Sequence, residues 1–160
     1  MGSTSALPVM EKACKWLDDN EIPFEVNALS AHRTPDAVEA FAKGAQERGI
    51  KVIIAAAGMA AALPGVIAAS TNLPVIGVPI KGMLDGLDAM LSIIQMPPGI
   101  PTATVGVNAA QNAAILAAQI IGLSDSAVAA KVAAHKAGLG AKIEKANKDL
   151  AEVKYNFKTN

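Results

Sequence analysis

KVIIAAA at residues 51–57 and PVIGV at residues 74–78 are the two stretches that decide the fold. Each is a short, almost wholly apolar run, which is typical of a strand that is covered on both faces. Residues 60–70, between them, have helical spacing, and a second helix-like segment, residues 84–95, leads to PTATVGV at residues 101–107. Strands that alternate with helices predict an α/β fold with a doubly wound parallel sheet.

The N-terminal segments continue this alternation. Apolar residues recur at helical spacing over residues 8–20, and IPFEVNAL at residues 22–29 alternates apolar and polar residues as a strand does. Thr34 is predicted to cap a helix over residues 35–48, which has proline at its first position and a glycine after its end. The carboxyl ends of parallel strands share one edge of a sheet, so we expect the loops at those ends to form one ligand-binding rim.

The C-terminal part of the chain is predicted to be helical. Residues 109–121 form a helix rich in small residues, and a last helix runs over about residues 126–153 with a break or bend at residues 138–140, GLG. We therefore divide the single domain into an α/β core, residues 1–122, and a helical extension, residues 123–160.

The composition indicates a domain that assembles with copies of itself. Of the 160 residues, 52% are hydrophobic, 3% are aromatic and only 18% are charged. So little charge on a small domain indicates surface buried between subunits, although an ordinary alanine-rich monomer is the alternative. The 14 basic and 14 acidic residues balance, and the sequence lacks the basic stripe that is typical of nucleic-acid binders.

The sequence has no feature of an exported or membrane protein. We find no signal-peptide pattern, and no run of about 18 apolar residues is free of breaks, so we expect no contact with a membrane. The single cysteine, Cys14, excludes an intrachain disulfide and fits a reducing compartment. We expect a cytoplasmic protein in which Cys14 packs among apolar helix positions.

The loop SAHRTP, residues 30–35, is the strongest candidate for chemistry. His32 lies directly between a predicted strand and a helix start, and an imidazole exchanges protons near neutral pH. Arg33 offers a planar fork for a phosphate, and the following helix start adds backbone donors. A loop histidine that merely caps the helix explains the spacing equally well. The other histidine, His135, is expected on a solvated or interface face of the C-terminal helix.

A second small, hydroxyl-rich loop, GSTS at residues 2–5, also precedes a helix. Its backbone amides and serine hydroxyls suit a phosphate, although the motif alone is a weak signal. Lys81 follows a buried strand and is interpreted as an ordinary loop lysine. No cysteine pair, HExxH motif or carboxylate cluster indicates a metal, and no nucleophile elbow is present.

The motifs are specific in combination. Six follow one another along the chain: GSTS (2–5), SAHRTP (30–35), AAAGMAAALPGVIAAS (55–70), LPVIGVP (73–79), LDGLDAMLSIIQMPPGIPTATVGV (84–107) and NAAILAAQI (112–120). In this order they resemble the N5-carboxyaminoimidazole ribonucleotide mutase family of purine biosynthesis over residues 2 to 122. SAHRTP and LPG resemble the bacterial mutase class more than the carboxylase class, which uses free carbon dioxide.

The resemblance implies a three-layer α/β/α, flavodoxin-like fold and a cytoplasmic homo-octamer. It implies an isomerase that moves a carboxyl group from the exocyclic nitrogen of an aminoimidazole ribonucleotide to a ring carbon. This reaction needs no metal and no organic cofactor. The substrate is a small ribonucleotide, and neither nucleic acid nor a membrane is a partner.

The resemblance also assigns roles to residues of the two loops and of the strand that ends near residue 58. It makes His32 the general acid and base. It makes Ser3, Ser5 and Arg33 the residues that bind the 5′-phosphate. It makes Ser30, Ala57 and Gly58 the walls of the pocket around the imidazole ring of the substrate.

Three departures from the family pattern bear on activity. The family has aspartate, which holds the ribose hydroxyls, where this chain has Ala6, and losing such a charge-assisted bond costs about 1.5–3 kcal/mol. Many relatives have glycine at the position of Met59 and histidine at that of Ala62. The family also has an apolar strand before the GSTS loop, which this sequence does not show.

Two other hypotheses stay open beside an active mutase. One is a scaffold of the same family that assembles but turns over weakly or not at all, and the other is a flavodoxin-like phosphate or nucleotide binder of a different class. For the absent central strand we expect a replacement, either residues 152–158 (EVKYNFK) or a neighbouring chain, because unpaired backbone inside a sheet is costly.

Overall fold

The computed structural model describes residues 1–160 and contains a parallel three-stranded sheet in the order β1-β2-β3. The strands are β1 (Ile53–Gly58), β2 (Val75–Ile80) and β3 (Ala103–Thr104). In the register of the first pair, Ile53 lies opposite Val75 and Gly58 lies opposite Ile80. The two predicted apolar strands are confirmed, whereas the predicted strand over residues 101–107 is ladder-paired only at its two central residues.

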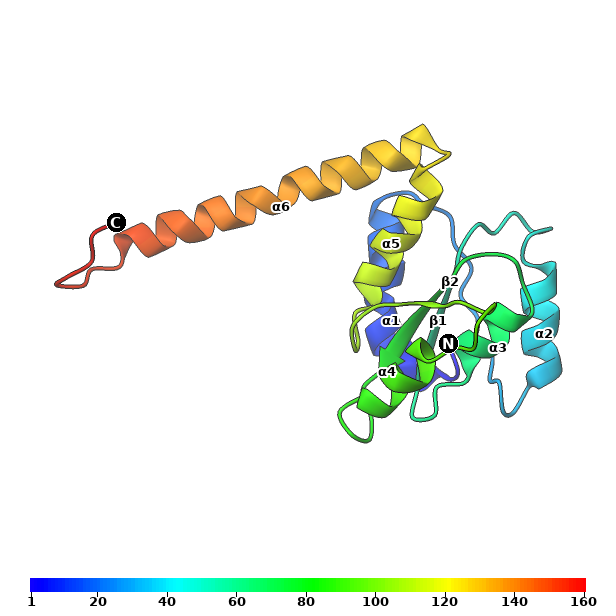
Figure 1. Cartoon of the computed structure of the whole chain (residues 1–160). Coiled ribbons are helices and arrows are strands. Elements are labelled where there is room, and N and C mark those ends of the chain that lie inside the picture. Colours follow the sequence, from blue (N-terminus) through cyan, green and yellow to red (C-terminus); the bar gives the residue numbers. More distant parts are fainter.

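Helices cover both faces of the sheet, so the predicted three-layer α/β/α arrangement is confirmed (Figure 1). One face carries α1 (Leu7–Asp19), preceded by the short 3₁₀ turn η1 (Thr4–Ala6), and α5 (Ala110–Gly122). The other face carries α2 (Pro35–Gly44), α3 (Leu63–Ala69) and α4 (Leu87–Ile94). Prolines occupy the first turns of α1, α2 and α3, where the amide hydrogen that proline lacks would have no helical partner.

The core is built from small residues, as the composition requires. Five alanines of α5 are fully or almost fully buried against α1 and β2: Ala110, Ala113, Ala114, Ala117 and Ala118. On the opposite face α4 lies so close to β2 that a Cβ built on Gly77 would lie 2.3 Å from Ile93 Cγ2. The alanines of α5 are therefore used in packing inside the chain.

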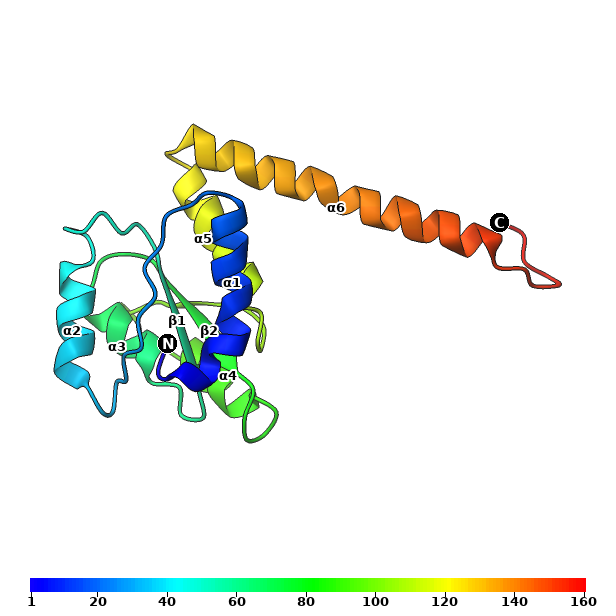
Figure 2. The same cartoon turned by 180° about the vertical axis from the view of Figure 1, so that it is seen from behind.

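The predicted strand over residues 22–29 is wrong. This segment is extended but belongs to no ladder, and it runs beside β1 between α1 and α2 (Figure 2). No hydrogen bond joins residues 22–28 to β1. The alternating pattern is present, but the backbone pairing of this segment with a neighbour is limited to two bonds with Met1, from the Met1 amine to the Asn27 carbonyl and from the Leu29 amide to the Met1 carbonyl.

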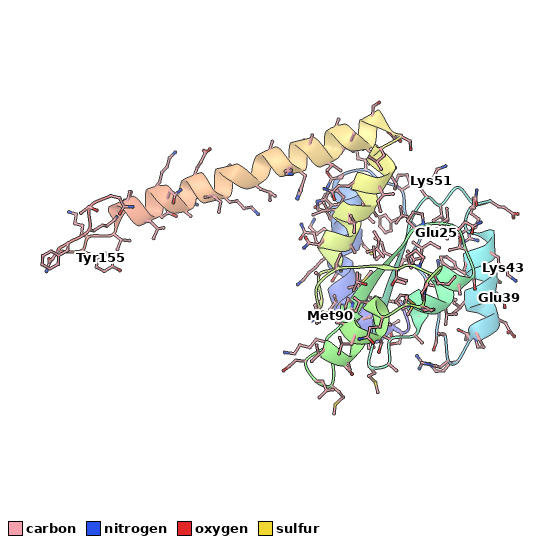
Figure 3. The ribbon with its side chains drawn as sticks, in the orientation of Figure 1. Glu25, Glu39, Lys43, Lys51, Met90 and Tyr155 are labelled. Carbon is pink, nitrogen blue, oxygen red and sulfur yellow. The ribbon has the colours of Figure 1, made fainter.

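The last helix, α6 (Ser126–Glu152), projects from the core as one continuous helix (Figure 1). The break predicted at residues 138–140 is wrong, because the helix runs through both glycines. Residues 152–158 form no strand and lie at the far end of α6, where Figure 3 shows Tyr155, so they do not fill the gap beside β1. The docked end of α6 is held by Trp16 Nε1–H, which donates to His135 Nδ1 at 3.2 Å.

Candidate active site

Two loops far apart in the sequence meet at the carboxyl end of β1. The Gly2 amide donates to the Ala56 carbonyl at 3.3 Å, which places the GSTS loop at the sheet edge. Arg33 Nη2 donates to the Gly2 carbonyl at 2.9 Å, which ties the SAHRTP loop to the first loop. The structure thus brings together the two loops that sequence reasoning proposed to share a phosphate.

The SAHRTP loop is fixed by its own side chains. Ser30 Oγ accepts both the backbone amide and Nε–H of Arg33, each at 3.2 Å. The Thr34 hydroxyl accepts the Ser30 amide at 3.0 Å and donates to the Ser30 carbonyl at 3.2 Å. Thr34 stands at the N-cap position of α2, but its hydroxyl bonds back into the loop, so the predicted side-chain cap is wrong. The first amides of α2 are left without a side-chain acceptor.

The first loop presents two hydroxyls as a pair. Ser3 Oγ and Ser5 Oγ lie 2.5 Å apart, and one of them donates to the other. Ser3 precedes the turn η1 in extended conformation, and its side chain does not cap that turn. Both hydroxyls, together with the amides of the turn, are available to an anion.

His32 lies in the turn between Ser30 and Arg33, on an exposed part of the loop. Its imidazole makes no hydrogen bond within the chain, whereas Ser30, Arg33 and Thr34 around it are all engaged. A free imidazole on a fixed loop is able to accept and release a proton without breaking a structural contact.

The end of β1 supplies half-buried backbone beside the loops. A Cβ on Gly58 would lie 3.3 Å from the Ile80 carbonyl, so this position favours glycine. The following residues Met59 and Ala61 have φ of 57° and 36°, an unfavourable conformation for side-chain-bearing residues. Ala57 is half-buried at the same strand end. Strain of this kind often accompanies a ligand-binding loop.

Ala6 departs from the family and is also buried. It is 5% exposed and packs in the core cluster that contains Met10 and Trp16. It stands at the N-cap of α1, where no side chain accepts a hydrogen bond from the helix. The position expected to hold a ribose-binding carboxylate is therefore apolar and leaves a helix start uncapped.

Sequence reasoning missed one rim residue, Asn108. It adopts φ of 58°, its Oδ1 accepts the Lys81 amide at 2.9 Å, and its own amide donates to the Pro79 carbonyl at 2.8 Å. It thereby joins the loops that follow β2 and β3. An asparagine directly between a predicted strand and a helix is the signal that identifies such a residue. Lys81 itself is exposed and ion-paired with Asp85 at 3.0 Å.

The candidate site is an open rim in the single chain. A cavity of about 490 Å³ lies elsewhere, beside Met1, and none of the proposed site residues lines it. No group of three or more metal-ligating side chains comes together, and no helix is long and apolar enough to cross a membrane.

Comparison with known proteins agrees with the motif order. Residues 1–142 match a family model described as AIR carboxylase. The N5-carboxyaminoimidazole ribonucleotide mutase of Pyrococcus abyssi is 60% identical over 124 residues, which cover 77% of this chain and 71% of that protein. The phosphoribosylaminoimidazole carboxylase of Saccharomyces cerevisiae is 56% identical over 133 residues, which are 82% of this chain and 23% of that protein.

The fold is shared with a solved structure as well. The crystal structure of Treponema denticola PurE superposes with a TM-score of 0.82 at 30% identity, and the match covers 94% of each chain. The resemblance drawn from the six motifs is thus confirmed at the level of both sequence and fold, and the chain belongs to the AIR carboxylase family.

Proposed function

We propose that this chain is an N5-carboxyaminoimidazole ribonucleotide mutase. The observation that carries the proposal is the junction of the two loops, in which Arg33 reaches Gly2 and leaves His32 unbonded on a fixed turn. The relative from Pyrococcus abyssi, which bears that name, supports it. Residues 1–122 hold the site, and residues 123–160 serve assembly.

The chemistry assigned to the loops is proton transfer around a migrating carboxyl group. The carbon–nitrogen bond of the carbamate breaks, and His32 gives a proton to the exocyclic nitrogen as carbon dioxide leaves. The ring carbon then bonds to carbon dioxide, and His32 takes the proton that this carbon loses. The 5′-phosphate rests on Ser3, Ser5 and Arg33, with Ser30 positioning Arg33. The end of β1, Ala57 and Gly58, walls the pocket.

Turnover of the ribonucleotide tests this assignment. We expect conversion in both directions between the N5-carboxy and 4-carboxy forms at a rate independent of added bicarbonate. A rate proportional to bicarbonate would instead support a carboxylase, the activity named for the Saccharomyces cerevisiae relative. An intact oligomer without turnover would support the scaffold hypothesis.

Two substitutions separate chemistry from binding. His32→Asn should lower turnover by about 100-fold or more, because the only free proton carrier of the loop is lost. Ala6→Asp should raise the specificity constant by roughly 10- to 100-fold, the value of one charge-assisted bond to the ribose. Parental turnover in His32→Asn would contradict the mechanism, and no gain in Ala6→Asp would mean that the ribose is held elsewhere.

The projecting helix α6 supports assembly into a homo-octamer. It has 27 residues, none of them buried, and it extends for about 40 Å at 1.5 Å per residue. Leu139, Ile143 and Leu150 follow one another at intervals of four and seven residues and are 47%, 64% and 60% exposed, so they form a stripe that suits other helices. Light scattering should give eight times the chain mass, and a monomer would contradict this. A reducing cytoplasm fits the free thiol of Cys14.

A further inference from the structure

The projecting helix α6 is in contact with the core along its first three turns. Val128, Val132 and His135 are half-buried and follow one another at intervals of four and three residues, so they lie on one face of the helix. Val128 and Val132 pack against the apolar cluster that contains Trp16. Every residue from 136 to 152 is exposed, and Figure 1 shows this part of α6 running free of other elements. His135 is therefore the last point at which α6 is held.

The contact at His135 specifies the charge of its imidazole. Trp16 lies in α1, is 5% exposed, and has an indole that can donate a hydrogen bond but cannot accept one. This indole donates to His135 Nδ1 at 3.2 Å, and the two rings meet edge to face with their centroids 5.4 Å apart. Nδ1 accepts this bond only while it carries no proton, because both nitrogens of an imidazolium are donors. The docked arrangement therefore requires a neutral His135 with its proton on Nε2.

Protonation of His135 turns this attractive contact into a repulsive one. Two N–H donors then face each other, and the indole of Trp16, which makes no other hydrogen bond, loses its acceptor. No carboxylate lies within ion-pair distance of His135 to stabilise an imidazolium. The docked helix thus binds fewer protons than a released helix, so the equilibrium between them shifts toward release as the pH falls.

The carboxylates near the pair are already compensated by lysines. The charged residues within one turn of Trp16 or of His135, together with their ion-pair partners, are Lys12, Lys15, Asp18, Asp19, Glu21, Lys131 and Lys136. Asp19 pairs with Lys15 at 3.0 Å. Glu21 pairs with Lys131 at 3.3 Å. Neither carboxylate is therefore free to hold a proton on His135.

The remaining charges around the pair do not favour an imidazolium either. Asp18 is two positions after Trp16 in α1, which places it about 200° around the helix and away from the pair. Lys12 and Lys136 are positive and disfavour a further cation at His135. The helix α5, which also packs against α6, carries no charged residue. Nothing from these elements offsets the loss of the hydrogen bond.

We propose that Trp16 and His135 form a proton-operated latch for α6. With His135 neutral, the indole holds the start of α6 on α1 and fixes the direction in which the exposed part of the helix projects. With His135 protonated, the first turns of α6 separate from α1, and the helix moves about the turn at residues 123–125. An imidazole changes its charge between about pH 5 and pH 8, so the latch operates in this range.

The latch can be observed directly, because the chain contains one tryptophan and two histidines. The fluorescence of Trp16 in the full chain, followed from pH 8 to pH 5, should show a single transition as the surroundings of the indole change. Hydrogen exchange of the amides of residues 129–135, corrected for the intrinsic effect of pH, measures the release itself. Their protection should fall by about fivefold or more, the loss expected for one hydrogen bond. The amides of Ile76 and Val78 in β2 should keep theirs.

Two substitutions separate the latch from other titrations. His135→Asn places an amide oxygen where Nδ1 stands along the side chain, has a similar helix propensity and does not titrate. The protection of residues 129–135 in this variant should be equal at pH 5 and pH 8. His32→Asn removes the only other histidine and should retain both the fluorescence transition and the loss of protection.

Four results would overturn the proposal. Constant protection of the parent between pH 8 and pH 5 would show that the packing of Val128 and Val132 alone docks the helix. A fluorescence transition without loss of protection would show that the imidazolium stays beside the indole. A loss of protection that persists in His135→Asn would assign the titration to another group. An equal loss in β2 would show unfolding of the core instead of release of α6. None of these measurements depends on turnover of the ribonucleotide.

Discussion

Replacing Arg33 by lysine tests the junction of the two loops most directly. Arg33 Nε and Nη2 are committed to Ser30 Oγ at 3.2 Å and the Gly2 carbonyl at 2.9 Å, while Nη1 has no partner in the chain. One edge of the guanidinium therefore holds the loops together, and the rest remains free for an anion. Lysine keeps the charge but not the fork, so Arg33→Lys removes the directed hydrogen bonds and leaves the charge in place.

The magnitudes follow from these contacts. Both internal bonds of Arg33 are exposed, so their loss should lower the free energy of unfolding by only about 1 kcal/mol. Loss of a charge-assisted bond to phosphate costs about 1.5–3 kcal/mol, which raises the dissociation constant roughly 10- to 150-fold. The substitution should thus affect ligand binding far more than stability.

The assay compares two ligands on two variants. Calorimetry measures the 4-carboxy ribonucleotide and the same nucleoside without its 5′-phosphate. Arg33→Lys should weaken only the phosphorylated ligand. Arg48→Lys is the matched control, because Arg48 also uses its fork, on Glu25 at 3.2 Å, but away from the rim. If Arg33→Lys weakens both ligands equally, Arg33 supports the loop without contacting phosphate, and the phosphate site as proposed is wrong.

Three further predictions concern packing, pH and the docking of α6. Gly77→Ala should destabilise the fold by about 1–3 kcal/mol in urea unfolding, because its Cβ would lie 2.3 Å from Ile93 Cγ2, and combined with Ile93→Ala it should cost less than the sum of the two single changes. Burial lowers the pKa of the Met1 amine in the folded chain, so the unfolded chain binds more protons in the pH range between the folded and the unfolded pKa. The free energy of unfolding should therefore rise with pH in this range, and acetylation of the N-terminus should remove this pH dependence. Trp16→Phe deletes the bond to His135 and should cost about 0.5–1.5 kcal/mol, with faster hydrogen exchange at the start of α6; unchanged exchange would show that apolar packing alone docks the helix.

The apolar pattern of the sequence predicted correctly the strands whose neighbouring strands and helices belong to the same chain. β1 and β2 are apolar on both faces, and each finds a neighbouring strand and two helical layers, so their assignment holds. Residues 22–29 have an equally strand-like pattern, but a strand exists only when its backbone is paired, and here the pairing is limited to two bonds with Met1. The periodicity of a segment indicates which of its faces suit burial, but it does not indicate whether a neighbouring strand is present to pair with its backbone.

The predicted bend in α6 failed for an energetic reason. A glycine inside a helix costs about 1 kcal/mol relative to alanine, which weakens a helix without breaking it. Gly138 and Gly140 also have open space around them, so no neighbouring element forces a change of direction. Thr34 occupies the N-cap position as predicted, but it makes no side-chain cap because its hydroxyl bonds to the amide and the carbonyl of Ser30. Side-chain competition of this kind is set by loop geometry, which residue type alone does not determine.

The sequence predicted the site as a set of loops, and in the single chain these loops form an open rim. The mechanism requires that carbon dioxide stay beside the imidazole between the two steps, which calls for a site closed to water. In the single chain His32 is exposed, and the cavity of about 490 Å³ does not include it. Exposed apolar side chains at the same rim, Met59 at 65% and Met83 at 70%, are costly in a monomer and suit contact with another subunit. The oligomer that we propose accounts for both the open rim and the unpartnered α6, because neighbouring subunits would cover the two surfaces and confine the proposed chemistry.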